Sequence, residues 1–144
     1  MVNSILVLCE GNICRSPMAA GLIAARSPQL ATRSAGLGAL VGHPADETAV
    51  RLMRSRGVDI DTHRAEQVTR RMCLEADIVL VMDRDQRQRL EQMVPEACGR
   101  VFRLGEFTWQ DIPDPYRQPE QAFREALELI ETNVDRWLQR IERL

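Results

Sequence analysis

A short apolar segment near the start of the chain runs directly into a loop and then into a helix. The run Ile5-Leu6-Val7-Leu8 is typical of a strand buried on both faces of a parallel sheet, and it predicts a strand over 4–9. The chain continues as Cys9-Glu-Gly-Asn-Ile-Cys-Arg-Ser-Pro17. Ser16 is a preferred helix cap and Pro17 suits a first helical position, so a helix is predicted over 17–26.

Strand and helix patterns alternate along the rest of the chain. The last helix, from about 119, carries one apolar stripe, which favours packing on a sheet over a coiled coil. Gly36-Leu-Gly-Ala-Leu-Val-Gly42 is predicted to be a mobile loop. Such alternation predicts an α/β fold, a parallel sheet with helices on both faces, in one domain over 1–144. The other predicted strands cover 31–35, 77–82 and 100–104, and the other helices cover 46–56 and 84–94.

Composition excludes several classes of function. The net charge of −2 gives no indication of a nucleic-acid partner, and all 19 basic residues are arginine, which excludes a Walker lysine or a Schiff-base amine. No leader segment or apolar run long enough to span a bilayer is present, so we expect no membrane insertion and a cytoplasmic location. The four cysteines lack the spacing of a zinc site: Cys9, Cys14, Cys73 and Cys98.

The loop over 9–16 has the residues of an anion site, and we call it the phosphate loop. Backbone N–H groups between a strand end and a helix start can converge on one anion. Gly11 and Asn12 tolerate the positive φ of a tight curl, and Arg15 can hold two phosphate oxygens. The same positive field favours the thiolate form of Cys9, to which Ser16 can donate a hydrogen bond. The pattern predicts phosphate held above a nucleophile.

A second loop, Asp114-Pro115-Tyr116, is a candidate partner for this site. A phenolate leaving group needs a proton, and a phosphocysteine must then be hydrolysed by water. Asp114 can serve both needs, and Tyr116 offers a flat face for an aromatic ring.

Four motifs in this order resemble the low-molecular-weight protein tyrosine phosphatases, over essentially the whole chain. They are Cys9-Glu-Gly-Asn-Ile-Cys-Arg-Ser16, Ser34-Ala-Gly36, Asp61-Thr-His-Arg-Ala65 and Asp114-Pro-Tyr116. The stretches over 36–42 and 112–117 most resemble the bacterial branch encoded beside exopolysaccharide genes. The resemblance implies a three-layer fold with a four-stranded parallel sheet, no cofactor or metal, and a monomer or weak dimer. Its implied substrate is a phosphotyrosine protein, an autophosphorylated bacterial tyrosine kinase.

The resemblance also implies roles for individual residues. Cys9 is the nucleophile, Arg15 grips the phosphate, and Asp114 is the general acid and then the base. Side chains expected to keep the loop in shape are Asn12, Ser16, Ser34 and His63. Phosphate-binding residues are expected to be Glu10, Gly11, Asn12, Ile13, Cys14, Arg15 and Ser16.

Several positions depart from the family pattern or leave alternatives open. Glu10 stands where relatives usually carry an apolar residue, and we expect it to face the rim and disfavour acidic substrates. The substrate mouth is expected to contain Glu10, Leu40 and Tyr116, and to be less aromatic than in relatives. Cys14 is either a core residue or a backup thiol that forms a disulfide with Cys9. Asp83 either caps a helix or orients an arginine.

Two other functions compete with this interpretation. A thioredoxin-coupled arsenate reductase on the same fold needs two further cysteines close together, and Cys73 and Cys98 are expected in different elements as packing residues. A phosphoprotein-binding module without catalysis would not need Asp114. Trp109 either lines the mouth or fills the core.

Overall fold

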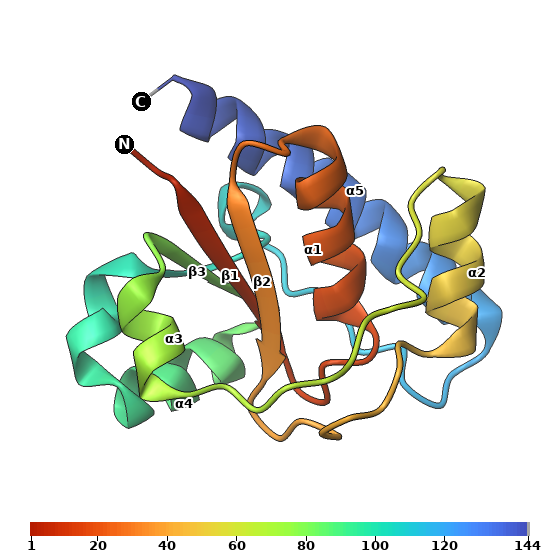
Figure 1. Ribbon diagram of the computed structural model, residues 1–144, viewed down its shortest axis with the longest axis horizontal. Helices are drawn as coiled ribbons and strands as arrows, with labels where there is room; N and C mark the ends of the chain where they lie inside the picture. The colour runs from red at the N-terminus through yellow and green to blue at the C-terminus, as the bar shows by residue number, and fades with distance from the viewer. Residues whose placement is uncertain (144) are drawn as a thin grey trace.

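Parallel strands in the order β2-β1-β3-β4 form the centre of the computed structural model, which describes residues 1–143 (Figure 1). The strand predictions are confirmed to within one residue at each end. β1 pairs with β2 on one side and β3 on the other, so Cys9 ends the strand at which the winding of the sheet reverses. Ligands of such sheets bind at this point, beyond the carboxyl ends of the strands. The strands are β1 (Ser4–Cys9), β2 (Ala31–Gly36), β3 (Ile78–Val81) and β4 (Val101–Arg103).

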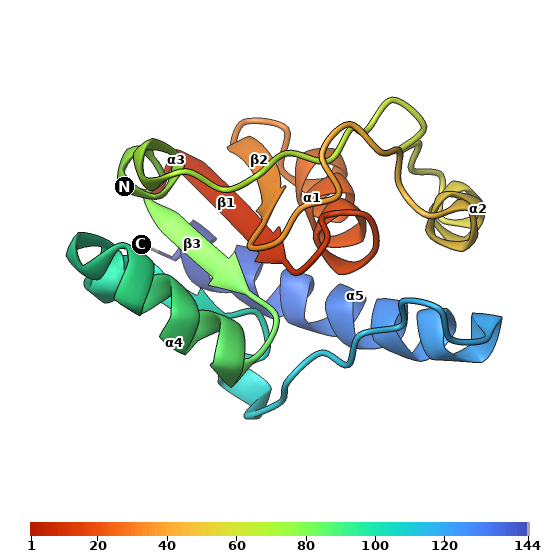
Figure 2. The same ribbon diagram turned by 90° about the horizontal axis from the view of Figure 1, so that it is seen from below.

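Helices cover both faces of the sheet, and this confirms the three-layer α/β fold (Figures 1 and 2). Alternate side chains of β1 point to opposite faces, as strand geometry requires. Ile5 and Val7 pack with α1 (Arg15–Arg26), α2 (Glu47–Ser55) and α5 (Glu120–Glu142). Leu6 and Leu8 pack on the other face with α3 (Arg70–Glu75), α4 (Arg84–Met93) and the 3-10 helix η1 (Pro95–Arg100).

The apolar stripe of α5 packs against α1 and the sheet, as its spacing predicts. Leu127, Ile130 and Val134 are fully buried, and each contributes about 1.5–3 kcal/mol by leaving water. The indole N–H of Trp137 donates a 2.8 Å hydrogen bond to the carbonyl of Leu104, just after β4. This contact fixes the last helix to the sheet edge. No helix in residues 1–143 is both long and apolar enough to cross a membrane.

Three predictions of local structure need correction. Helix α1 begins at Arg15, two residues early, because the Ser16 hydroxyl contacts Cys9 and Asn12 instead of capping the helix. Helix α3 was not predicted; it is six residues long and is capped by the Thr69 side chain. The segment over 36–42, expected to be mobile, is hydrogen-bonded along the phosphate loop.

A tight loop follows β4 and includes the short 3-10 helix η2 (Glu106–Thr108). The backbone passes so close to itself that a Cβ on Gly105 would lie 2.1 Å from the carbonyl oxygen of Gln110. Only glycine fits there without a shift of backbone.

We predict that Gly105→Ala lowers the free energy of unfolding by about 1–3 kcal/mol, the usual cost of a forced backbone shift. Gly99→Ala is the matched control, because a Cβ at Gly99 has no heavy atom within 4 Å. Denaturant titration of both variants measures the difference. Equal stability of the two would contradict the close approach.

Candidate active site

In the phosphate loop between β1 and α1, several backbone carbonyl groups point outward and accept hydrogen bonds from neighbouring segments. The carbonyls of Cys9, Glu10 and Gly11 accept hydrogen bonds of 2.9–3.0 Å from the segment over 36–42. The carbonyl of Ile13 accepts one of 2.8 Å from the N–H of Asp46. Within the described chain, the N–H groups of residues 10–15 have no protein acceptor. They are therefore available to an anion inside the curl.

Asn12 supplies the unusual backbone conformation of the loop, with φ at 60°. Asparagine enters this left-handed region more readily than most residues. Gly11 has no positive φ, so the expectation for Gly11 was wrong. A Cβ there would meet Ile13 and Leu40 at 3.8 Å, an ordinary contact distance.

The buried side chain of Asn12 braces the curl from within. Its amide nitrogen donates to the hydroxyls of Ser16 at 2.7 Å and Ser34 at 3.1 Å. Its amide oxygen accepts the N–H of Glu66 at 2.9 Å. The Nε2 of His63 lies 2.6 Å from the carbonyl of Asn12. These partners come from helix α1, strand β2 and the loop before α3, so the loop shape depends on segments far apart in the sequence.

Cys9 lies at the floor of the site with 2% of its surface exposed. Its sulfur is 2.9 Å from the Ser16 hydroxyl oxygen. Because that oxygen accepts a hydrogen bond from Asn12, its own proton is free to point at the sulfur and stabilise a thiolate. Burial raises the pKa of the Cys14 thiol, so Cys14 stays protonated at neutral pH and does not compete as a nucleophile.

Arg15 is buried and holds the second loop close to the first. Its Nη1 donates to the carbonyl of Ile112 at 2.7 Å and lies 3.5 Å from an oxygen of Asp83. Its Nη2 lies 3.6 Å from Asp114 Oδ2. In the described chain, Arg15 Nε is the only buried side-chain nitrogen or oxygen without a hydrogen-bond partner. A phosphate oxygen in the pocket would satisfy this costly unpaired donor.

Asp83 both caps a helix and faces an arginine, the two alternatives that the sequence left open. One of its oxygens accepts the N–H of Gln86 at 2.8 Å and caps α4. The other faces Arg15.

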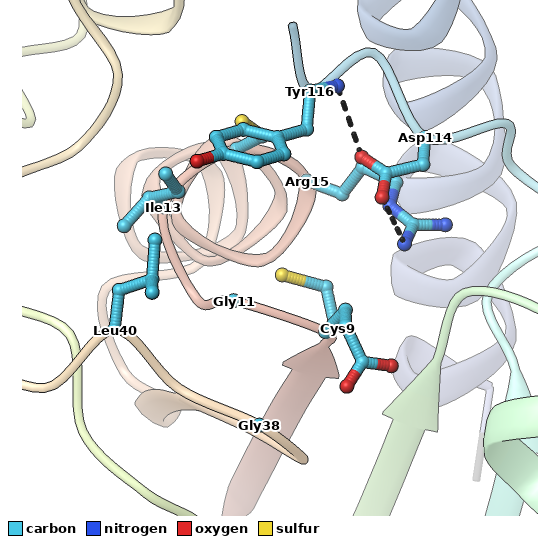
Figure 3. Close-up of a pocket in the computed structure, with 10 residues that line it drawn as sticks. Cys9, Gly11, Ile13, Arg15, Gly38, Leu40, Asp114 and Tyr116 are labelled. Atoms are coloured by element: carbon cyan, nitrogen blue, oxygen red, sulfur yellow. Dashed lines mark hydrogen bonds and ion pairs between the residues drawn. The ribbon is translucent and has the colours of Figure 1, made fainter.

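A single pocket contains the predicted catalytic residues (Figure 3). Tyr116 lies across the opening from Ile13 and Leu40, and Asp114 lies beside Arg15 (Figure 3). The pocket is lined by Cys9, Glu10, Gly11, Ile13, Cys14, Arg15, Gly38, Leu40, Asp114 and Tyr116. The arrangement can hold an anion at the floor and a flat ring at the opening.

Trp109 differs from expectation, and Arg117 makes a contact beside the pocket opening. Trp109 is 79% exposed and does not line the pocket, so neither of its two expected positions is found. The guanidinium of Arg117 lies over the Tyr116 ring, 5.2 Å from its centre. This cation–π contact supports the ring at the opening.

Glu10 lies at the edge of the pocket, but its charge is not free. Arg89 of α4 donates to both carboxylate oxygens, at 2.6 and 3.1 Å. This hydrogen bond, with the charge of Arg89, holds the pKa of Glu10 below its ordinary value. Sequence reasoning missed Arg89, because no local pattern links positions that far apart.

The remaining cysteines do not form a relay with Cys9. Cys73 is buried as predicted, on the opposite face of the sheet from Cys9. Cys98 is exposed and donates to Glu91 at 2.8 Å, so its predicted packing role was wrong. Within residues 1–143, no three His, Cys, Asp or Glu side chains are grouped to hold a metal ion.

Comparison with known proteins agrees with this geometry. A model of the low molecular weight phosphotyrosine protein phosphatase family matches residues 4–144. The probable low molecular weight protein-tyrosine-phosphatase EpsP of Ralstonia nicotianae is 50% identical over 144 residues, covering 100% of this chain and 99% of EpsP. Wzb of Escherichia coli is 41% identical over 140 residues, covering 96% and 95% of the two chains.

A solved structure has the same fold. Wzb of Vibrio vulnificus in complex with benzylphosphonate superimposes with a TM-score of 0.94 at 36% identity, covering 97% of this chain and 99% of that one. The fold and the family match together define a phosphotyrosine protein phosphatase. The chain belongs to the low molecular weight protein-tyrosine phosphatase family, and the arsenate reductase alternative is not favoured.

We predict that Glu10→Gln lowers the free energy of unfolding at pH 7 by about 0.2–1 kcal/mol, because the ion pair is partly exposed. The folded-state pKa of Glu10 lies below its ordinary 4.5, so its stabilisation is present above that pH. It is lost as the pH falls through the folded pKa.

Denaturant titrations from pH 7 to pH 3 should therefore show the two proteins converging in acid. Glu128→Gln, at an exposed carboxylate with no ion pair among the described residues, is the control. A difference in the free energy of unfolding between wild type and Glu10→Gln that stays constant from pH 7 to pH 3 would contradict the lowered pKa of Glu10.

Proposed function

We propose that the chain hydrolyses phosphotyrosine in a protein substrate through a phosphocysteine intermediate. Cys9 is the nucleophile, Arg15 grips the phosphate, and Asp114 moves the protons. The observation that carries the proposal is that all three side chains line one pocket, with Arg15 linking the phosphate loop to the Asp114 loop.

In the first step, the Cys9 thiolate attacks phosphorus. The bond from phosphorus to the tyrosyl oxygen breaks, and that oxygen takes the proton of the Asp114 carboxyl group. The loop N–H groups and the Arg15 guanidinium stabilise the negative charge on the transferring group. Ser16 stabilises the sulfur before attack, through its 2.9 Å contact.

In the second step, water attacks the phosphorus of the phosphocysteine. The Asp114 carboxylate takes a proton from that water, and the bond from phosphorus to sulfur breaks. Inorganic phosphate leaves, and the Cys9 thiolate and the Asp114 carboxyl group are restored. Ser16 again stabilises the sulfur, now as the leaving group.

The pocket favours an aromatic phosphate ester. Cys9 is nearly inaccessible at the floor, so the side chain that carries the phosphate has to be long. Tyr116 on one side and Leu40 with Ile13 on the other can enclose a flat ring. Phosphotyrosine meets both requirements, and phosphoserine is too short.

We further propose an autophosphorylated bacterial tyrosine kinase of exopolysaccharide production as the substrate. The supporting observations are the likeness to EpsP and Wzb over nearly the full chain and the stretches over 36–42 and 112–117. We place the reaction in the cytoplasm, because the mechanism needs Cys9 and its neighbour Cys14 as reduced thiols.

We predict that Cys9→Ser abolishes hydrolysis of p-nitrophenyl phosphate, while Cys98→Ser, at an exposed thiol outside the pocket, leaves it unchanged. Asp114→Asn should lower kcat/KM for phenyl phosphate by roughly 10²–10⁴, the usual contribution of a positioned acid. EDTA should change none of these rates. Activity that survives in Cys9→Ser would overturn the mechanism.

We also predict opposite effects of the two partners at the pocket edge. Glu10→Gln frees the charge of Arg89 and should favour phosphopeptides with acidic flanking residues. Arg89→Gln frees the charge of Glu10 and should favour basic ones. Each change in the acidic-to-basic ratio of kcat/KM should reach up to about fivefold, as expected for an exposed ion pair. An unchanged ratio in both variants would exclude a role in substrate choice.

A further inference from the structure

Two arginines are the only buried charged side chains among the described residues. They are Arg15, in the phosphate loop, and Arg103, the last residue of β4, with 3% and 4% of their surfaces exposed. The mechanism uses Arg15 and assigns nothing to Arg103. A buried guanidinium is costly unless carboxylates pair with it, so its partners show what it holds.

Arg103 joins the two ends of the loop that follows β4. Its Nε donates to Glu106 at 3.2 Å, and its Nη1 donates to Asp111 at 3.0 Å. Arg87 of α4 donates to the other oxygen of Glu106 at 3.2 Å. We call Arg103, Glu106 and Asp111 the Arg103 clamp. It fixes the point where the chain enters the Asp114 loop.

Ile112, the residue after Asp111, is held in place by Arg15 and by the backbone of Met82. Ile112 is buried, its N–H donates to the carbonyl of Met82 at 2.8 Å, and its carbonyl accepts the bond from Arg15. Asp114 follows two residues later, beside the same guanidinium. The two buried arginines thus hold adjacent points of one segment, Arg103 at Asp111 and Arg15 at Ile112 and Asp114.

We propose that Arg103 is a positioning residue for the general acid, acting through Asp111. Arg15 interacts with phosphate, so the charge that it faces changes during each turnover. The Arg103 clamp makes no contact with the pocket, and its hold on the segment stays constant while that charge changes. This inference rests on the proposed function, in which Asp114 protonates the leaving group.

The test compares leaving groups. Phenyl phosphate needs a proton on its departing oxygen, whereas dinitrophenyl phosphate releases a stable phenolate without one. Because kcat/KM reports the step that breaks this bond, it separates a misplaced acid from a general loss of structure. Asp111 is half-exposed, so Asp111→Ala removes the contact without leaving a cavity.

We expect Asp111→Ala to lower kcat/KM for phenyl phosphate roughly tenfold, part of the 10²–10⁴ that a positioned acid contributes. The value for dinitrophenyl phosphate should change less than about twofold. Arg103→Met should show the same pattern, and Arg103→Lys should restore part of the rate. Asp135→Ala is the matched control, because it removes an exposed carboxylate that pairs with Arg26 outside the clamp and the pocket, and it should leave the ratio of the two substrates unchanged.

Non-additivity gives a second readout. If the Arg103 clamp acts through Asp114, Asp111→Ala has no further effect on phenyl phosphate in an Asp114→Asn background. An equal loss on both substrates, no loss on either, or full additivity with Asp114→Asn overturns the proposal. If Arg103→Met fails to fold, Asp111→Ala still decides it. Failure of the wild-type protein to hydrolyse either ester would instead refute the proposed function.

Discussion

The direction of a few backbone hydrogen bonds determines what this site can do. The carbonyls of residues 9–11 and 13 are bonded to neighbouring segments, and this leaves the loop N–H groups on the inner side. The arrangement needs one residue in the left-handed conformation, and Asn12 provides it while its buried side chain bonds to helix α1, strand β2 and the segment at Glu66. Loss of that brace would change the position of every donor around the anion.

Local sequence patterns predicted the strands of the fold, and the structure brings the predicted Cys9, Arg15 and Asp114 to one pocket. The apolar runs located the strands, because a strand buried on both faces has a simple signature. The spacing from Cys9 to Ser16 is a local property of one loop, so its contacts could be foreseen. Helix α3 was missed because six residues give too little periodicity to detect.

Contacts between distant charged residues could not be predicted in the same way. Glu10 was expected to face the rim with its charge free, and only the packing of α4 beside the phosphate loop gives it Arg89 as a partner. The pairing of Arg103 with Asp111 likewise depends on the turn that Gly105 permits after β4. In a chain with 19 arginines and 21 acidic residues, sequence alone offers too many pairings to choose among.

The near-complete burial of the Cys9 sulfur also determines how the protein meets reactive small molecules. Small molecules reach that sulfur through the pocket that Cys9 lines, and a phosphate group would enter by the same pocket. An alkylating agent or a peroxide therefore has to occupy the place of the substrate before it can react. In the proposed mechanism, the inorganic phosphate released by each turnover would shield the thiol, so the enzyme would be least open to chemical damage when its product is abundant.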